Sequence, residues 1–168
     1  MLKNDGIPTR EEIETILPTP ERLKKGPVAI IECFQDIPCD PCVTACPTKA
    51  IQMQSGITDK PHLEEKRCTG CSMCITGCPG LAIFVLDRSK SEKTSVLSVP
   101  YEMLPLPKAG DIVIGLDRGG KPVCEVKVLR VGGCKKHDRT SAITFELPRE
   151  FDMDVRAIRV KSVKGARK

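Results

Sequence analysis

The chain has 168 residues, 40% of them hydrophobic, and a net charge of +5, which allows one packed domain or two small ones. No apolar run approaches the roughly 18 to 20 residues of a membrane span, and the first residues lack the layout of a signal peptide, so we expect a cytoplasmic chain with reduced thiols and no membrane span. Only 3% of the residues are aromatic, which leaves the ten cysteines as the candidates for organising the fold.

Residues 1–27 are predicted to form an arm with short helices. Thr9 and Glu12 make a capping box for a helix over 10–17, and the Thr-Pro pair at 19–20 is a second helix start. Neither helix is long enough to be stable alone in water. We therefore expect the arm to dock on the rest of the chain or on a partner.

An internal repeat occupies residues 28–86. Each copy holds four cysteines, and a proline follows the last of them: Cys33, Cys39, Cys42 and Cys46 in the first copy, Cys68, Cys71, Cys74 and Cys78 in the second. The last three cysteines of the first copy recur 32 residues later. Cys33 recurs after 35 residues, because three additional residues follow it.

The second copy has the spacing C-x2-C-x2-C-x3-C-P, the bacterial [4Fe–4S] signature in which the fourth cysteine ligates the other cluster. Two intervening residues let a tight loop place three thiolates on three irons of a cube, and Pro79 ends that loop. We expect Gly70 and Gly77 to let the backbone pass close to the inorganic core. The first copy reads C-x5-C-x2-C-x3-C-P, which predicts a bulged loop with the same ligand set; a buried free thiol at Cys33 is the alternative.

On these motifs, residues 28–86 resemble the bacterial two-cluster ferredoxin domain. The resemblance implies two β hairpins and two short helices related by a pseudo-two-fold axis. It also implies two [4Fe–4S] clusters with crossed ligation. One cluster would take Cys33, Cys39, Cys42 and Cys78, and the other would take Cys68, Cys71, Cys74 and Cys46.

Zinc sites and disulfides are the two other common uses of clustered cysteines. Structural zinc sites also use Cys-x2-Cys pairs, but zinc needs four ligands in two pairs, whereas each copy has three close cysteines and a fourth before proline. A disulfide framework needs an exported chain. Buried clusters need an apolar wall, for which the candidates are Val28, Ile30, Ile37, Val43, Ile51, Met73, Ile75, Ile83 and Val85.

From about residue 95 the pattern changes to short strands, predicted over 112–116, 123–131, 142–147 and 155–160, with turns at Gly119–Gly120 and Gly132–Gly133. The predicted fold class is therefore α+β: an arm over 1–27, a ferredoxin-like cluster domain over 28–94 and a small antiparallel β domain over 95–168 with a basic C-terminal tail. Residues 95–168 carry 15 basic and 9 acidic side chains, against 12 and 13 in residues 1–94.

The remaining candidates favour ordinary structural roles. Cys124 and Cys134 have only His137 and Asp138 as possible co-ligands and are interpreted as free thiols, and His62 as a surface residue. The basic tail could suggest nucleic acid, but few aromatics and no recognition motif accompany it, so an acidic protein partner or plain solubility is favoured.

No nucleophile–base pair, phosphate loop or dinucleotide fingerprint appears, so we expect no catalytic site in this chain. The arm and the β region exceed what a free ferredoxin needs. We therefore expect an electron-transfer subunit that works with a flavoprotein or another redox catalytic subunit. The x5 loop followed by such a β tail is similar to the small ferredoxin-like subunits of flavin-dependent amino-acid or amine dehydrogenases. The alternatives are a free electron shuttle and a protein whose clusters are structural or regulatory.

Overall fold

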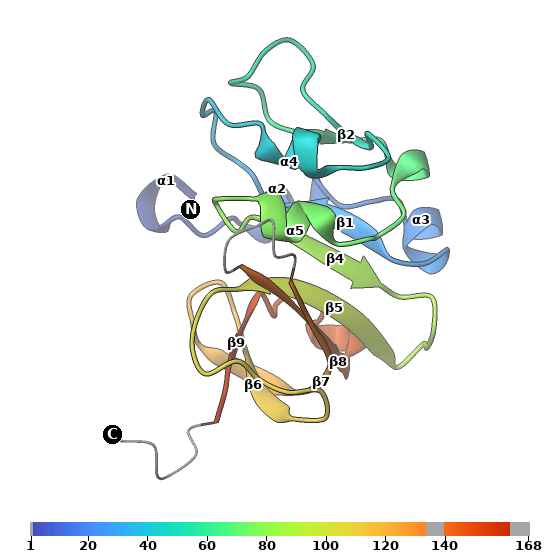
Figure 1. Ribbon diagram of the computed structural model, residues 1–168, viewed down its shortest axis with the longest axis vertical. Coiled ribbons are helices and arrows are strands. Elements are labelled where there is room, and N and C mark those ends of the chain that lie inside the picture. The colour runs from blue at the N-terminus through green and yellow to red at the C-terminus, as the bar shows by residue number, and fades with distance from the viewer. Residues whose placement is uncertain (1, 134–139, 162–168) are drawn as a thin grey trace.

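Short helices occupy the first half of the chain and long strands the second half (Figure 1). The computed structural model describes residues 2–133 and 140–161. The helices and 3-10 turns are α1 Leu2–Asp5, α2 Arg10–Glu14, α3 Pro20–Lys24, α4 Pro41–Ala45, η1 Glu65–Arg67, α5 Met73–Gly77 and η2 Arg149–Phe151. Within these described residues, none of the helices has the length and apolar character that crossing a membrane requires.

Seven strands form one antiparallel sheet in the order β1-β4-β5-β8-β7-β6-β9, and β2 pairs with β3. The strands are β1 Val28–Ile31, β2 Ile51–Gln52, β3 His62–Leu63, β4 Ile83–Asp87, β5 Thr94–Tyr101, β6 Ile112–Leu116, β7 Pro122–Gly133, β8 Ser141–Pro148 and β9 Ala157–Arg159. β9 returns to contact β5, so the far part of the sheet curls on itself (Figure 1). The mixed α+β class is confirmed. Strand β5 begins at the predicted domain boundary between residues 94 and 95 and pairs with β4 on one side and β8 on the other, so the sheet crosses that boundary. The division into separate domains stays a prediction.

The strand pair β1–β4 is buried on both faces and separates two hydrophobic cores. Successive side chains of a strand point to opposite faces. Ile30 and Phe84 therefore join the core of the β-rich half, whereas Ile31, Ile83 and Val85 join a second core that contains the cysteines.

This alternation corrects the predicted apolar wall. Val28 and Ile30 pack into the β-rich core, on the face of β1 turned away from the cysteines. Ile37 lies in the bulged loop of the first copy with 45% of its surface exposed. Their places in the cysteine core are taken by Ala29 and Ile31.

The strands predicted for residues 112–160 are confirmed with altered ends. The turn predicted at Gly132–Gly133 is wrong, because both glycines continue β7 and pair with Ala142 and Ser141 of β8. Strand β5, which contains Pro100, was not predicted from the sequence. This proline lies beyond the segment of β5 that pairs with β4, so β5 has a neighbouring strand on one side only at this position. Fewer backbone N–H groups are needed for sheet hydrogen bonds there, which makes a proline tolerable.

The N-terminal arm docks on this chain. The capping box is confirmed, since the Thr9 side chain accepts from the Glu12 N–H and the Glu12 carboxylate accepts from the Thr9 N–H. The helix ends at Glu14, earlier than predicted. Ile13 and Leu23 are buried, and Leu23 belongs to the β-rich core.

Arg22 of α3 joins the arm to the loop that starts at Cys68. Its guanidinium donates to the carbonyl oxygens of Glu65, Gly26, Pro27 and Cys68 at 2.7–3.0 Å. These bonds fix the path of the backbone on both sides of the contact. Nothing in the sequence pattern had singled out this arginine.

Gly70 allows the Cys68 loop to lie directly against the end of the arm. Its φ is +66°, and a Cβ atom built there would lie 2.5 Å from Cβ of Pro27. The requirement for glycine here comes from Pro27 as well as from any approach to a cluster. Gly77 is the last residue of α5, and its expected approach to a cluster stays a prediction.

Gly70→Ala is expected to destabilise the protein by at least about 1–3 kcal/mol, since the left-handed backbone strains an L residue and Pro27 must move. Gly80→Ala is the matched control, because Gly80 has ordinary φ and open space around its Cα. The measurement is the denaturant midpoint under anaerobic conditions. Equal midpoints for the two variants would contradict the close contact.

Candidate iron–sulfur centre

The two copies of the repeat place their cysteines in equivalent positions. Cys42 lies in α4 and Cys74 in α5, and both are buried. Cys46 and Cys78 follow directly as the C-caps of these helices. Helices α4 and α5 contact each other, so the two copies meet through their cysteine-bearing helices.

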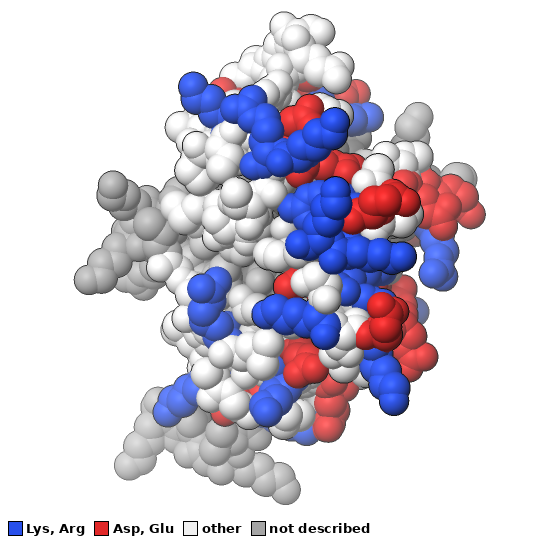
Figure 2. Space-filling model, turned by 90° about the vertical axis from the view of Figure 1, so that its right-hand side faces the viewer, with Lys and Arg blue, Asp and Glu red and all other residues white. Residues whose placement is uncertain are grey.

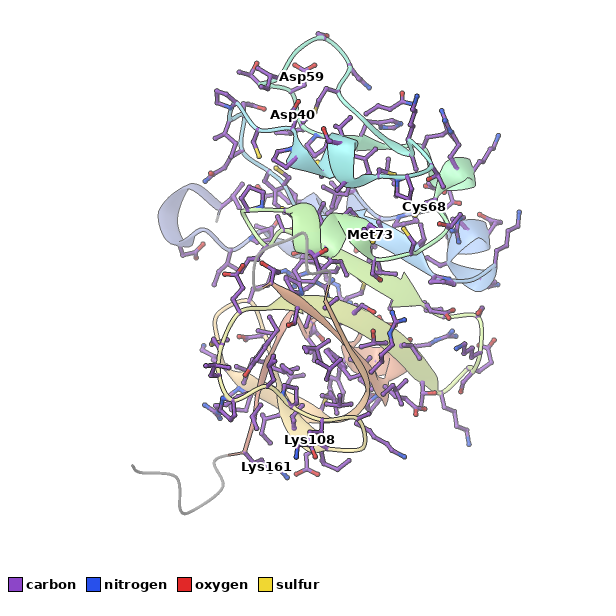
Figure 3. All side chains as sticks on the ribbon, in the orientation of Figure 1. Asp40, Asp59, Cys68, Met73, Lys108 and Lys161 are labelled. Atoms are coloured by element: carbon purple, nitrogen blue, oxygen red, sulfur yellow. The ribbon has the colours of Figure 1, made fainter. Side chains whose placement is uncertain are left out.

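One set of thiols surrounds a single pocket. Cys46 of the first copy lies there with Cys68, Cys71 and Cys74 of the second copy. The free space enclosed at its centre is about 10 Å³, and it rises to about 310 Å³ when all gaps between the atoms and the open mouth are included. Figure 3 shows Cys68 on the side of the molecule where α3 lies. The remaining wall is mostly apolar, with Ala29, Ala50, Ile51, Leu63 and Val85 among its residues.

The same grouping appears in the electrostatics of Cys74. Burial, followed by the charges of Cys68, Cys71 and Cys46, raises the pKa of its thiol to about 12. Four thiolates in one apolar pocket repel one another unless a cation binds among them. Thiolate is the soft ligand that iron–sulfur clusters use, and it is formed when metal binding releases the thiol proton.

The other cysteines form a second electrostatic set. Burial raises the pKa of Cys42 to about 11, assisted by the charges of Cys78, Cys39 and Cys33. Burial also raises the pKa of Cys33, with Cys78 and Cys39 as the next causes. The thiol of Cys33 is therefore near this set despite the five-residue gap that follows it.

Backbone N–H groups point at the sulfur atoms of three cysteines. Ala50 N–H donates to Sγ of Cys46 at 3.2 Å, and Ala82 N–H donates to Sγ of Cys78 at 3.4 Å. These two bonds are equivalent in the two copies. Ala29 N–H donates to Sγ of Cys68 at 3.5 Å. Such donors stabilise negative charge on sulfur, which a cluster with four thiolates requires.

Hydrogen bonds lower the pKa of the Cys46 thiol. Burial alone would raise its pKa, but hydrogen bonds from the Thr48 side chain and from the N–H groups of Ile51, Ala50 and Thr48 outweigh burial and lower it. The thiol that the first copy contributes to this pocket therefore loses its proton more readily than burial alone would allow.

The first copy carries the bulged loop at the outer end of the molecule. Cys39 N–H bonds to the Ile57 carbonyl at 3.1 Å, which ties this loop to the segment before β3. Asp40 and Asp59 lie at that end (Figure 3). Cys33 also lines a groove of about 440 Å³ together with Glu32, Arg118 and Arg156.

The other singled-out residues lie apart from both sets. Cys124 is half-buried beside the β-rich core, and burial raises its pKa. Cys134, His137 and Asp138 lie outside the described residues. His62 is exposed in β3 opposite Gln52. Among the described cysteines none forms a disulfide, and within the described part no three His, Cys, Asp or Glu side chains are placed to hold a single metal ion.

Comparison with known proteins assigns this region. Residues 37–82 match the family model of the 4Fe-4S dicluster domain, a span that includes seven of the repeat cysteines and excludes Cys33. No solved structure matches the chain.

Three curated relatives each match part of the chain. Uncharacterized ferredoxin MJ0155 of Methanocaldococcus jannaschii is 36% identical over 80 residues, 46% of this chain and 49% of that protein. Electron transport protein HydN of Escherichia coli is 31% identical over 75 residues, 45% and 41%. Ferredoxin-type protein NapF of Haemophilus influenzae is 36% identical over 58 residues, 33% of each.

The aligned part of the chain spans less than half the length of each of these relatives. Their names agree with the chemistry of the site, in which soft thiolates line an apolar compartment with N–H donors. The chain therefore carries a bacterial-type ferredoxin domain over the matched region.

Proposed function

We propose that this chain carries two [4Fe–4S] clusters and serves as the electron-transfer subunit of a multi-subunit oxidoreductase. One cluster is bound by Cys33, Cys39, Cys42 and Cys78, and the other by Cys68, Cys71, Cys74 and Cys46. The observation that carries the proposal is the pocket in which Cys46 lies among three cysteines of the other copy. The paired strands β1–β4 and β2–β3, with one short helix for each copy, support a pseudo-two-fold arrangement.

The clusters supply a carrier that accepts and donates one electron at a time, and the chain supplies its surroundings. The thiolates hold the iron, and the N–H groups of Ala29, Ala50 and Ala82 offset the charge on sulfur. Cys42 and Cys74 are buried, which limits water at the inner side. Cys71 is exposed and gives one corner of the second set a short path to the surface.

Several exposed features support a subunit over a free shuttle. The loop between β5 and β6 exposes Met103 (57%), Leu104 (85%) and Leu106 (45%), and Ile37 and Ile57 are exposed beside the first set of cysteines. Exposed apolar side chains that lie together commonly mark protein contacts. On the face shown in Figure 2, Lys and Arg are interleaved with Asp and Glu, which favours a protein surface over nucleic acid as partner.

The partner that we propose is a flavoprotein or another redox catalytic subunit in the cytoplasm. The support is the combination of an x5 loop with a β region that follows the cluster domain, which is similar to the small subunits of flavin-dependent amino-acid or amine dehydrogenases. The names of HydN and NapF associate those proteins with electron transport and with ferredoxin.

Anaerobic purification should yield about eight irons and eight sulfides per chain, with EPR of the reduced protein showing two interacting spins. The expected number follows from two four-iron cubes. About four irons would mean that the altered first copy holds no cluster. A colourless, iron-poor but folded protein would overturn the whole proposal.

Crossed ligation makes a separate prediction. Cys46→Ser should damage the same cluster as Cys71→Ser, although the two cysteines belong to different copies. Cys42→Ser should damage the other cluster. EPR and iron content of the three variants identify the cluster that remains, and matching spectra for Cys46→Ser and Cys42→Ser would refute the assignment.

Size-exclusion chromatography of anaerobic native extract separates the subunit from the shuttle. The chain should elute with a larger species that contains flavin or another redox centre. Elution as an 18.4 kDa monomer with its clusters intact would favour the free shuttle.

A further inference from the structure

The residue before Cys33 is a buried carboxylate. Glu32 follows β1 directly, and its side chain is 7% exposed. Its N–H donates to the Ala82 carbonyl at 2.8 Å, which continues the pairing of β1 with the segment before β4. Its position matters because five residues separate Cys33 from Cys39, so the spacing alone does not bring the first thiol to the set.

Two arginines from the far end of the chain hold this carboxylate. Arg118 Nε donates to Oε2 at 2.8 Å and Nη2 donates to Oε1 at 2.6 Å, while Arg156 Nε donates to Oε1 at 2.6 Å. Arg118 lies in the β6–β7 turn, and Arg156 precedes β9. The β-rich half therefore binds the chain through the side chain of the residue directly before Cys33.

Both arginines are themselves fixed. Arg118 Nη1 donates to the Met153 carbonyl at 2.9 Å. Arg156 Nη1 donates to the carbonyls of Asp152 and Val155, and its guanidinium lies 5.1 Å from the centre of the Phe84 ring. These bonds hold both guanidinium groups in place against the Glu32 carboxylate.

We propose that Arg118, Glu32 and Arg156 position Cys33 as a ligand, and that the C-terminal β region is thereby a part of the first cluster site. This rests on the proposed two-cluster function. In the second copy the tight C-x2-C spacing brings the first cysteine to the other ligands. In the first copy the bidentate ion pair between Arg118 and Glu32 takes over this positioning. A buried ion pair is weak evidence for stability as such, whereas it restricts geometry strongly.

The test compares Arg118→Gln with wild type for the iron retained against a chelator. Loss of a partner that orients a metal ligand typically lowers metal affinity about 10–100-fold. The variant should therefore lose half of its iron at chelator concentrations that leave the other half bound. EPR should show that the lost half is the cluster removed by Cys33→Ser.

Arg88→Gln is the matched control. Arg88 makes a bidentate pair with buried Asp152, and this pair also joins the end of β4 to the β-rich half, but it is not adjacent to a repeat cysteine. Ser95 still donates to Asp152 in that variant, as Arg156 still donates to Glu32 in Arg118→Gln. A purely structural role predicts the same iron loss in both variants.

Selective loss in Arg118→Gln but not in Arg88→Gln supports the positioning role. Unchanged iron retention in Arg118→Gln, or equal loss from both clusters, overturns it. Should Arg118→Gln not fold, Arg118→Lys keeps the charge without the bidentate geometry and is expected to weaken the same half. Wild type with about four irons would overturn the two-cluster proposal itself, which is a different outcome from eight irons and an inert Arg118 variant.

Discussion

The structure depends on one strand pair that is buried on both faces. β1 and β4 lie between the cysteine core and the β-rich core, and the alternation of their side chains assigns each residue to one side. Ile31 and Val85 face the cysteines, whereas Ile30 and Phe84 face the other core. A slip of one residue in this pairing would exchange the two sets, so the register of β1–β4 determines the walls of both compartments at once.

The cysteine compartment combines two opposing requirements. An apolar wall excludes water but disfavours thiolate, as the raised pKa values of Cys42 and Cys74 show. N–H groups aimed at sulfur act in the opposite direction, and at Cys46 they outweigh burial and lower the pKa. Iron completes the balance, because its positive charge favours the deprotonated ligands that the wall alone would protonate.

Segments outside the repeat hold the first cysteine of each copy. Arg22 from the arm bonds to the Cys68 carbonyl, and Arg118 and Arg156 from the β-rich half bond to the carboxylate before Cys33. The arm and the β region are therefore in direct contact with the cysteine-bearing part of the chain, and β5 and β8 continue the sheet from β4 into the β-rich half. A frame held by these bonds suits the proposed electron transfer, in which little rearrangement should accompany the gain or loss of charge.

The local spacing of cysteines, prolines and glycines determined the chemistry of this protein, because three thiolates and a closing proline within one short loop suit few metal centres. Capping residues and alternating apolar residues likewise determined α2, α3 and most C-terminal strands. Only the tertiary structure decided which face Ile30 takes, that β5 joins the two halves, and that Glu32 meets Arg118 and Arg156. Those features come from contacts between residues far apart in the chain, and a local sequence pattern does not indicate which distant residue a side chain or strand will contact.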